Sequence, residues 1–459
     1  MVDLLQRSPK GEPGGLLELL KLALPAGISQ ASFSLMMFTD RLLLTPLGKE
    51  TPAASMLAGF TSFLLAVFFF GLLNYITPLV AQLVGSGQPS KVSCVVHQGV
   101  LITLLAYPLI LILGELGVST YFDWTGIHTT QKILAKKYFT VINIGSLFTL
   151  LNIVMSSFFA GVGRTYVVMV INTAGMILNI PVSYCLIHSG VGGFCQGIEG
   201  AALGSILSTA CMFILFGYVY LSSEYRKNFK TNLRLKWDRY TMRKLIYFGS
   251  PSGIEMLLTF LAFSTFVALF HSYGANEALA ATIALNWDIV AFMPVWGISI
   301  GLMSLVGKYM GARDIKHAVQ SVKSGAIASF ATMLVASVIF FTLTEALVGV
   351  FLPDRSTTTY DEIMPLASTM LKLISLYCFA NAANLTISGA LRAAGDTKAV
   401  MCISVTGQWL MLAASYLTIK VWECEPLVSW SIFVCSLFFE TLLLSLRFYQ
   451  GSWKKIQVV

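Results

Sequence analysis

The sequence contains little charge for its length. Of its 459 residues only 11% are Asp, Glu, Lys or Arg, whereas a soluble domain carries about 25% charged residues. Hydrophobic residues make up 56% of the chain. This composition excludes a soluble globular protein. Only one connection, residues 222–244, is long and polar, so no segment remains for a large soluble domain.

The motifs of catalysis and of metal binding are also missing. There is no P-loop and no HExxH, and the eight cysteines form neither a CxxC nor a Cys/His ligand spacing. Most cysteines lie in apolar runs, where cysteine acts as a small hydrophobe. Cys195 and Cys424 fall in predicted external loops, so a single disulfide between them stays open. We expect no enzyme and no cofactor.

Long apolar runs alternate with charged or Gly/Pro-rich breaks along the whole chain. Crossing about 30 Å of hydrocarbon takes about 20 residues in a helix. Twelve runs are long enough: 17–47, 52–84, 93–117, 133–160, 165–189, 200–222, 245–273, 277–306, 318–351, 362–391, 398–420 and 427–449. We predict an all-α membrane protein with twelve transmembrane helices in two pseudo-symmetric six-helix lobes: an N-lobe (1–222), a basic cytoplasmic linker (223–244) and a C-lobe (245–459).

The distribution of Lys and Arg predicts the orientation. If residues 222–244 are cytoplasmic, 22 of the 30 Lys and Arg lie on that side or near it, seven lie on the other side, and Arg41 lies within the first run. Basic residues accumulate on the cytoplasmic side of membrane proteins. We therefore predict that both termini are cytoplasmic, and we interpret the net charge of +8 as topology rather than nucleic-acid binding.

The two sets of six runs repeat one another. Pro25 and Pro251 lie 226 positions apart, as do Gly48 and Gly274, and as do Gly85 and Gly311. A third motif, AGVGRTYVVMVIN against RAAGDTKAVMCIS, recurs at a spacing of 232. Each half has an even number of runs, so both halves enter the membrane from the same side. The repeats are then parallel, with an axis along the membrane normal.

These segments resemble the multidrug and toxic compound extrusion (MATE) transporters. The resemblance lies in LPAGISQASFSLMMFTDRLLLTPLG, GVGRTYVVMVINTAGMILNIPVSY, IEGAALGSILS and GALRAAGDTKA, and it extends over nearly the whole chain. It implies a secondary antiporter with two lobes in a V, which exports small organic, cationic or amphipathic compounds while Na+ or H+ enters. It implies no other cofactor.

Asp40 is the principal candidate of the N-lobe. It precedes Gly48 by eight residues, about 12 Å along a helix, which places a carboxylate inside the outer leaflet. Such a charge costs about 2.5–3.5 kcal/mol unless it meets water, a cation or a partner. The resemblance assigns cation binding to this position and adds Asn179, with Ser183 and Ser205 where many members have Asp and Thr. A structural salt bridge is the alternative.

The C-lobe departs from the family pattern. Thr259 and Asn381 stand where many members carry Glu and some carry Asp. Glu255 lies one turn before Thr259, and Asp288 follows in the next run at a similar depth of roughly 15–17 Å. We predict that Glu255 and Asp288 share one proton at a displaced site. The alternative is that they make polar helix contacts.

Two other functions stay open. One is a related flippase for a lipid-linked precursor, which a basic groove facing the membrane would favour. The other is a membrane-embedded enzyme or receptor, which needs a catalytic cluster or a sizeable external domain. The expected partners are membrane lipid and a small-molecule substrate, with no nucleic acid, and we expect a monomer in the plasma (inner) membrane.

Overall fold

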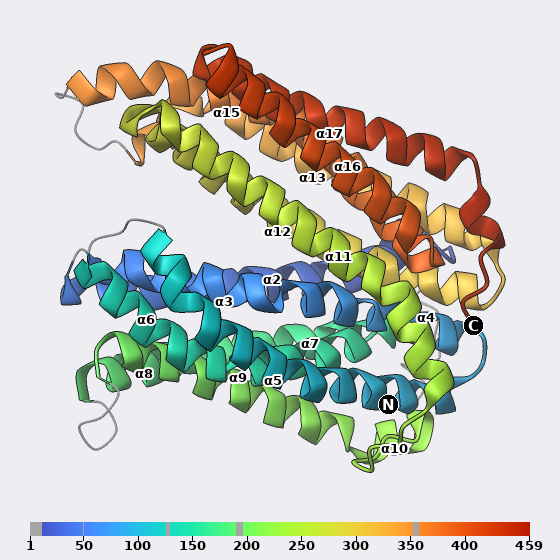
Figure 1. Cartoon of the computed structure of the whole chain (residues 1–459). Helices are drawn as coiled ribbons and strands as arrows, with labels where there is room; N and C mark the ends of the chain where they lie inside the picture. Colours follow the sequence, from blue (N-terminus) through green and yellow to red (C-terminus); the bar gives the residue numbers. More distant parts are fainter. Residues whose placement is uncertain (1–11, 49, 125–128, 190–195, 352–357) are drawn as a thin grey trace. The chain divides into compact units, whose positions relative to one another are not determined.

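The structure, a computed structural model, describes residues 12–48, 50–124, 129–189, 196–351 and 358–459, and every regular element in these ranges is helical (Figure 1). The helices of the first half are α2 (Leu16–Leu44), α3 (Glu50–Asn74), α4 (Ile76–Gly85), α5 (Val92–Trp124), α6 (Thr129–Ile144), α7 (Ser146–Gly161), α8 (Thr165–Ser189) and α9 (Ile198–Tyr220). The short α10 (Ser223–Phe229) follows. The second half contains α11 (Arg239–Phe270), α12 (Ala275–Gly311), α13 (Ile315–Thr342), α14 (Thr344–Gly349), α15 (Thr358–Ala394), α16 (Thr397–Tyr416) and α17 (Pro426–Tyr449).

The all-helical membrane fold is confirmed. Within the described ranges, 11 helical segments are long and apolar enough to cross a membrane. The pair α6 and α7 makes a twelfth if it counts as one span, broken by a bend of 45°. Three predicted runs each contain two helices. Run 52–84 is divided between α3 and α4, and run 133–160 between α6 and α7. In run 318–351, α13 ends at Thr342 and α14 starts anew at Thr344. At the break before α14, the Thr344 hydroxyl donates to the Phe341 carbonyl (3.0 Å), so this backbone acceptor has a hydrogen-bond partner.

The repeat is visible in the backbone. Left-handed φ angles occur at Gly48 (127°) and Gly274 (156°), each directly after a 3-10 turn. They recur at Gly87 (72°) and Arg313 (60°), also 226 positions apart. At the spacing of 232 they recur at Gly163 (78°) and Gly395 (96°). Because this backbone region is rarely adopted, its recurrence indicates that equivalent turns join equivalent helices in the two halves.

The described helices form two compact units. One contains residues 28–256, and the other contains residues 1–27 together with 257–458. Helices α2 and α11 therefore each contribute a first part to one unit and a second part to the other. In the unit 28–256, a Cβ at Gly71 would meet the Ser252 carbonyl at 2.4 Å, so the absence of a side chain lets α3 approach α11. The division into lobes at residues 223–244 stays a prediction.

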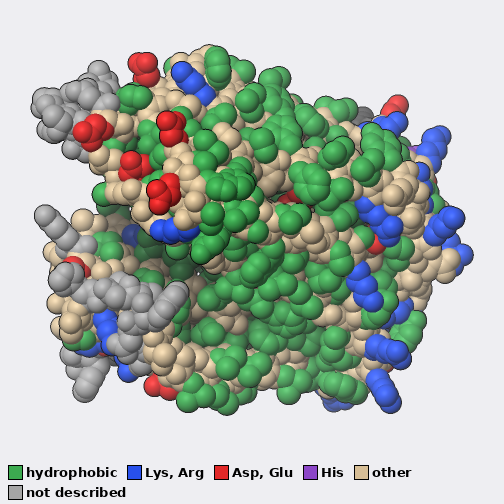
Figure 2. Space-filling model, turned by 45° about the horizontal axis from the view of Figure 1, so that its top comes forward, with side chains coloured by type: hydrophobic (Ala, Val, Ile, Leu, Met, Phe, Trp, Pro, Cys, Tyr) green, Lys and Arg blue, Asp and Glu red, His purple; other side chains and the backbone are tan. Residues whose placement is uncertain are grey.

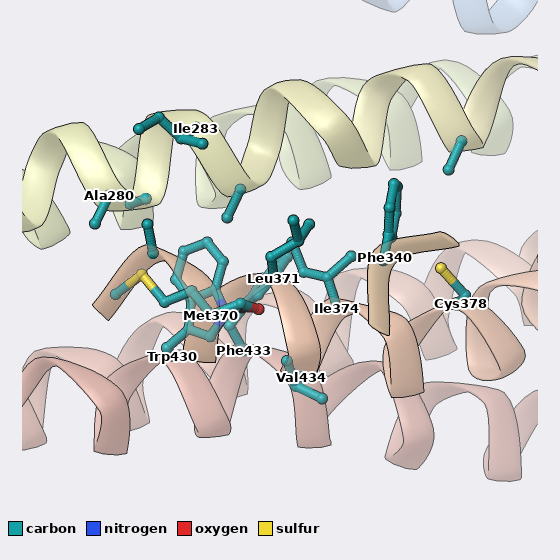
Figure 3. Packing of buried hydrophobic residues seen from close by; sticks show 14 of the residues in the cluster. Ala280, Ile283, Phe340, Met370, Leu371, Ile374, Cys378, Trp430, Phe433 and Val434 are labelled. Atoms are coloured by element: carbon teal, nitrogen blue, oxygen red, sulfur yellow. Dashed lines mark hydrogen bonds between the residues drawn. The ribbon is translucent and has the colours of Figure 1, made fainter. Parts of the chain in front are cut away.

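The unit that contains α12 to α17 has a large apolar core (Figure 3). Trp430 and Phe433 of α17 lie against α15, and the Trp430 indole N–H donates to the Met370 carbonyl at 3.2 Å. The rings of Phe433 and Phe266 stack with centroids 5.2 Å apart. Ala280 and Ile283 of α12 border the same cluster. This packing holds α12, α15 and α17 together.

The surface fits a membrane. In Figure 2 hydrophobic side chains cover much of the drawn face, and Lys and Arg side chains gather mainly at one edge of it. Three large apolar side chains on membrane-spanning helices, Leu105, Leu116 and Ile214, are 66–74% exposed. Contact of this apolar surface with water would be unfavourable, whereas contact with lipid hydrocarbon is not. Cys195 lies outside the described residues, so its pairing with Cys424 is not decided.

The basic linker packs on several helices of the unit 28–256. Its residues lie against α5, where the Gln98 amide donates to the Lys236 carbonyl at 2.7 Å and the His97 ring nitrogen Nε2 lies 3.0 Å from the Asn232 carbonyl oxygen. Both α5 side chains are buried.

The turn between α12 and α13 ends in a helix cap. Asp314 caps α13, and its hydrogen bond with His317 holds the pKa of the Asp314 carboxyl below its usual value.

Candidate functional site

Asp40 lies in the unit 28–256 and is 6% exposed. Its carboxylate accepts one hydrogen bond from each of two other helices. The Ser183 hydroxyl of α8 donates to Oδ1 at 3.2 Å, and the Ser205 hydroxyl of α9 donates to Oδ2. Three helices far apart in sequence thus converge on one intramembrane carboxylate. The structure brings together the residues that the sequence predicted for this site.

Asn179 extends the cluster by one turn of α8. Its amide Nδ2 donates to the Ser183 hydroxyl at 3.1 Å, so Asn179 orients the group that binds Asp40. Asn179 is fully buried, and its Oδ1 has no hydrogen-bond partner. An unpaired buried carbonyl costs about 1–3 kcal/mol. This oxygen is therefore an acceptor left open one turn of α8 from Ser183.

Gly204 makes the cluster possible. A Cβ at this position would lie 2.3 Å from Ser183 Oγ and 2.8 Å from Ser183 Cα. The lack of a side chain lets α9 approach α8 closely enough for Ser183 and Ser205 to reach the same carboxylate. The motif GAALGS therefore acts through its second glycine as well as through its serine.

Tyr138 is a neighbour that the sequence reasoning did not identify. It lies on α6, is 7% exposed, and lies near enough to Asp40 for the charge of that carboxylate to act on it. No local pattern marks it, because Tyr138 is 98 positions from Asp40 and comes near it only through the packing of α6.

The predicted C-lobe residues are divided between the two units. Glu255 of α11 is 5% exposed and belongs to the unit 28–256, whereas Thr259, Asp288 and Asn381 belong to the other unit. Asp288 Oδ1 and Asn381 Nδ2 are buried and have no hydrogen-bond partner. The shared proton of Glu255 and Asp288 stays a prediction.

Glu440 of α17 is a further buried acid, 5% exposed, and three polar side chains of α15 and α16 donate to it: Asn384, Ser404 and Gln408. The sequence marks it only as an acid in the last apolar run, which fits a packing role equally well. The hydrogen bonds become visible only once α15, α16 and α17 are packed.

The Asp40 cluster contains a single acidic side chain. Among the described residues, no group of three or more His, Cys, Asp and Glu is placed to hold a metal ion. A single carboxylate with hydroxyl and amide oxygens balances one positive charge. The Asp40 cluster thus suits a proton or a monovalent hard cation better than a divalent one.

Comparisons with known proteins agree with this architecture. The family model described as MatE matches residues 25–185 and 251–417, so the same model recognises both halves. The two matches begin 226 positions apart and end 232 apart, which confirms the internal repeat.

Individual relatives extend over nearly the whole chain. It is 26% identical over 447 residues to the "Probable multidrug resistance protein NorM" of Thermotoga maritima, with 96% of this chain and 94% of that protein covered. It is 27% identical over 422 residues to the "Multidrug resistance protein PmpM" of Pseudomonas aeruginosa, with 90% and 86% covered. A solved structure of a MOP superfamily transporter from Pyrococcus furiosus has a TM-score of 0.86 at 18% identity and covers 99% of both chains.

Proposed function

This chain belongs to the MatE family of multidrug and toxic compound extrusion transporters, and from that premise we propose that it exports small organic cations or amphipathic compounds in exchange for Na+ or H+. The names of its relatives state multidrug resistance, which supports the export of drugs. The observation that carries the coupling proposal is the Asp40 cluster.

The cluster has the chemistry of a coupling site. Asp40 is buried inside a membrane span, where an ionised carboxylate is costly unless a cation or hydrogen-bond donors stabilise it. Two hydroxyls already donate to it, and the Asn179 Oδ1 beside them has no partner. Binding Na+ neutralises the carboxylate and satisfies that oxygen, while binding H+ neutralises the carboxylate alone. The donor set therefore favours Na+, and gradients imposed separately distinguish the two ions.

The export step follows from the same electrostatics. A positively charged substrate and a coupling ion both compensate the charge of Asp40, so each disfavours binding of the other. Such competition makes substrate release on one side depend on ion entry, which is a coupling free energy between two ligands. We keep as a proposal the sequence prediction that Glu255 and Asp288 supplement Asp40 by sharing a proton. We also propose that the protein acts as a monomer in the plasma membrane, since the Asp40 cluster is built within one chain.

Transport into everted membrane vesicles tests the proposal. A fluorescent organic cation is followed under a Na+ gradient without a pH gradient, and then under the reverse condition. We expect one gradient to drive uptake by the wild type, and Asp40→Asn to lower that rate at least about tenfold, equivalent to about 1.4 kcal/mol of coupling. Asn keeps the size and polarity of the side chain, so the folded protein remains.

The matched control is Glu115→Gln, which neutralises an exposed acid on α5 of the same unit. It should transport like the wild type. Gradient-driven uptake by Asp40→Asn at the wild-type rate would show that the cluster does not couple transport.

A further inference from the structure

The carboxylate of Glu440 is buried in a span of the second half. Glu440 precedes Tyr449, the last residue of α17, by nine positions, about 14 Å along the helix, and is 5% exposed. A charged side chain at such depth costs about 2.5–3.5 kcal/mol unless polar groups or a counter-charge compensate it. Acids in membrane spans are therefore rare outside functional sites.

Three neutral side chains surround the carboxylate. Asn384 Nδ2 of α15 donates to Oε1 at 3.0 Å, and Ser404 Oγ of α16 donates to the same oxygen at 2.8 Å. Gln408 Nε2, one turn further along α16, donates to Oε2 at 3.3 Å. The four residues, which we call the Glu440 cluster, come from three helices of one compact unit and carry a single formal charge.

The internal repeat shows that the fold does not need an acid at this position. Gly407 of α16 faces Glu440, with an ideal Cβ 3.4 Å from Glu440 Cβ. The equivalent glycine 232 positions earlier is Gly175 of α8, and it faces Met212 of α9. The same helix crossing is therefore packed by methionine in one half and by glutamate in the other. Met packs the equivalent crossing, so packing alone does not require a charge at Glu440.

Polar groups continue from the cluster along α15. Tyr377, Asn381 and Asn384 follow a spacing of four and three residues, which places them on one face of the helix. Asn381 is 3% exposed, and its Nδ2 has no hydrogen-bond partner. The face thus extends from the cluster to a buried amide that lacks a partner.

We propose that the Glu440 cluster binds a monovalent hard cation, Na+, at a site separate from Asp40. Carboxylate, amide and hydroxyl oxygens are the ligands that hard cations prefer. A half-turn of each terminal amide replaces the NH2 groups of Asn384 and Gln408 by their oxygens, so the residues that donate to the free carboxylate become ligands of the bound ion. Rotation of Asn381 likewise turns its unpartnered amide end into an oxygen on the same face. The single negative charge matches one monovalent ion and leaves a divalent ion uncompensated.

The first test measures Na+ alone on the purified full chain in detergent. Equilibrium binding of radioactive Na+ is recorded at constant pH, with choline as the replacement cation, in the Asp40→Asn background. This background removes the carboxylate of the first cluster, so the result does not depend on the function proposed for Asp40. We expect saturable binding of one Na+ per chain.

The second step removes the carboxylate of the Glu440 cluster. Adding Glu440→Gln to Asp40→Asn should weaken Na+ binding at least about tenfold, which corresponds to about 1.4 kcal/mol. The matched control, Glu345→Gln in the same background, neutralises an exposed acid of the same unit and should leave binding unchanged. Ser404→Ala should weaken binding by a smaller factor, because it removes one neutral ligand.

Glu440→Met keeps the test valid if the Gln variant does not fold, because the equivalent crossing already contains Met212. It should fold and should not bind Na+ in the Asp40→Asn background. Three results would overturn the proposal: no saturable Na+ binding by Asp40→Asn, binding unchanged by both Glu440 variants, or a cluster that responds to acidification but not to Na+. A failure of Asp40→Asn to alter transport affects only the function proposed for Asp40.

Discussion

Gly204→Ala tests whether the close approach of α8 and α9 builds the Asp40 cluster. The added Cβ would lie 2.3 Å from Ser183 Oγ and 2.8 Å from Ser183 Cα, well inside normal contact. The hydroxyl can rotate away, but the Cα cannot, so the helices must separate by several tenths of an ångström. Overpacking of this kind costs about 1–3 kcal/mol.

Two further terms enter the balance. Replacing Gly by Ala in a helix gains about 1 kcal/mol of helix propensity. Rotating Ser183 away removes its hydrogen bond to Asp40, and a bond to a charged group contributes about 1.5–3 kcal/mol. The net expectation is a destabilisation of about 3 kcal/mol, together with weaker coupling, since Ser183 no longer faces the carboxylate.

The assay combines thermal unfolding in detergent with uptake into everted vesicles. Gly217→Ala is the matched control, because Gly217 lies on the same helix and a Cβ there would meet nothing within 4 Å. That variant should unfold at or slightly above the wild-type temperature and transport normally. If Gly204→Ala matched Gly217→Ala in both measurements, the close approach would not be what positions Ser183.

Two other predictions concern topology and the second half. A cysteine at Ser223, in a background without native cysteines, should resist an impermeant thiol reagent in intact cells, and ready labelling would reverse the orientation assigned from the basic residues. Binding of a cationic substrate should weaken on acidification, because protons compete for the shared charge, and Glu255→Gln and Asp288→Asn should reduce this dependence non-additively. An unchanged pH profile in the double variant would remove the shared proton from the mechanism.

The sequence by itself determined the membrane class, the positions of the spans and the repeat. Each of these depends on the composition of a contiguous segment or on matching spacings, and neither requires knowledge of the folded structure. A membrane span must be apolar because polar side chains cost free energy on transfer into lipid. The predicted runs coincide with helical segments, but three of them, 52–84, 133–160 and 318–351, each cover two helices. Apolar composition does not distinguish one helix from two.

Only the tertiary structure decided which polar groups meet. Asp40 stood out as an intramembrane acid, but its bonds to Ser183 and Ser205 and the neighbouring Tyr138 depend on how α6, α8 and α9 pack around α2. Glu440 was indistinguishable from a packing residue until its three donors came together.

The physical reason is that membrane insertion and hydrogen bonding between helices depend on different information. Insertion into lipid is set by each segment's own transfer free energy, which composition alone determines. A hydrogen-bond network is set by side-chain directions on several helices, and those depend on close contacts such as Gly204 against Ser183 and Gly407 against Glu440. The assignment of the first parts of α2 and α11 to separate compact units likewise follows from contacts that no single segment contains.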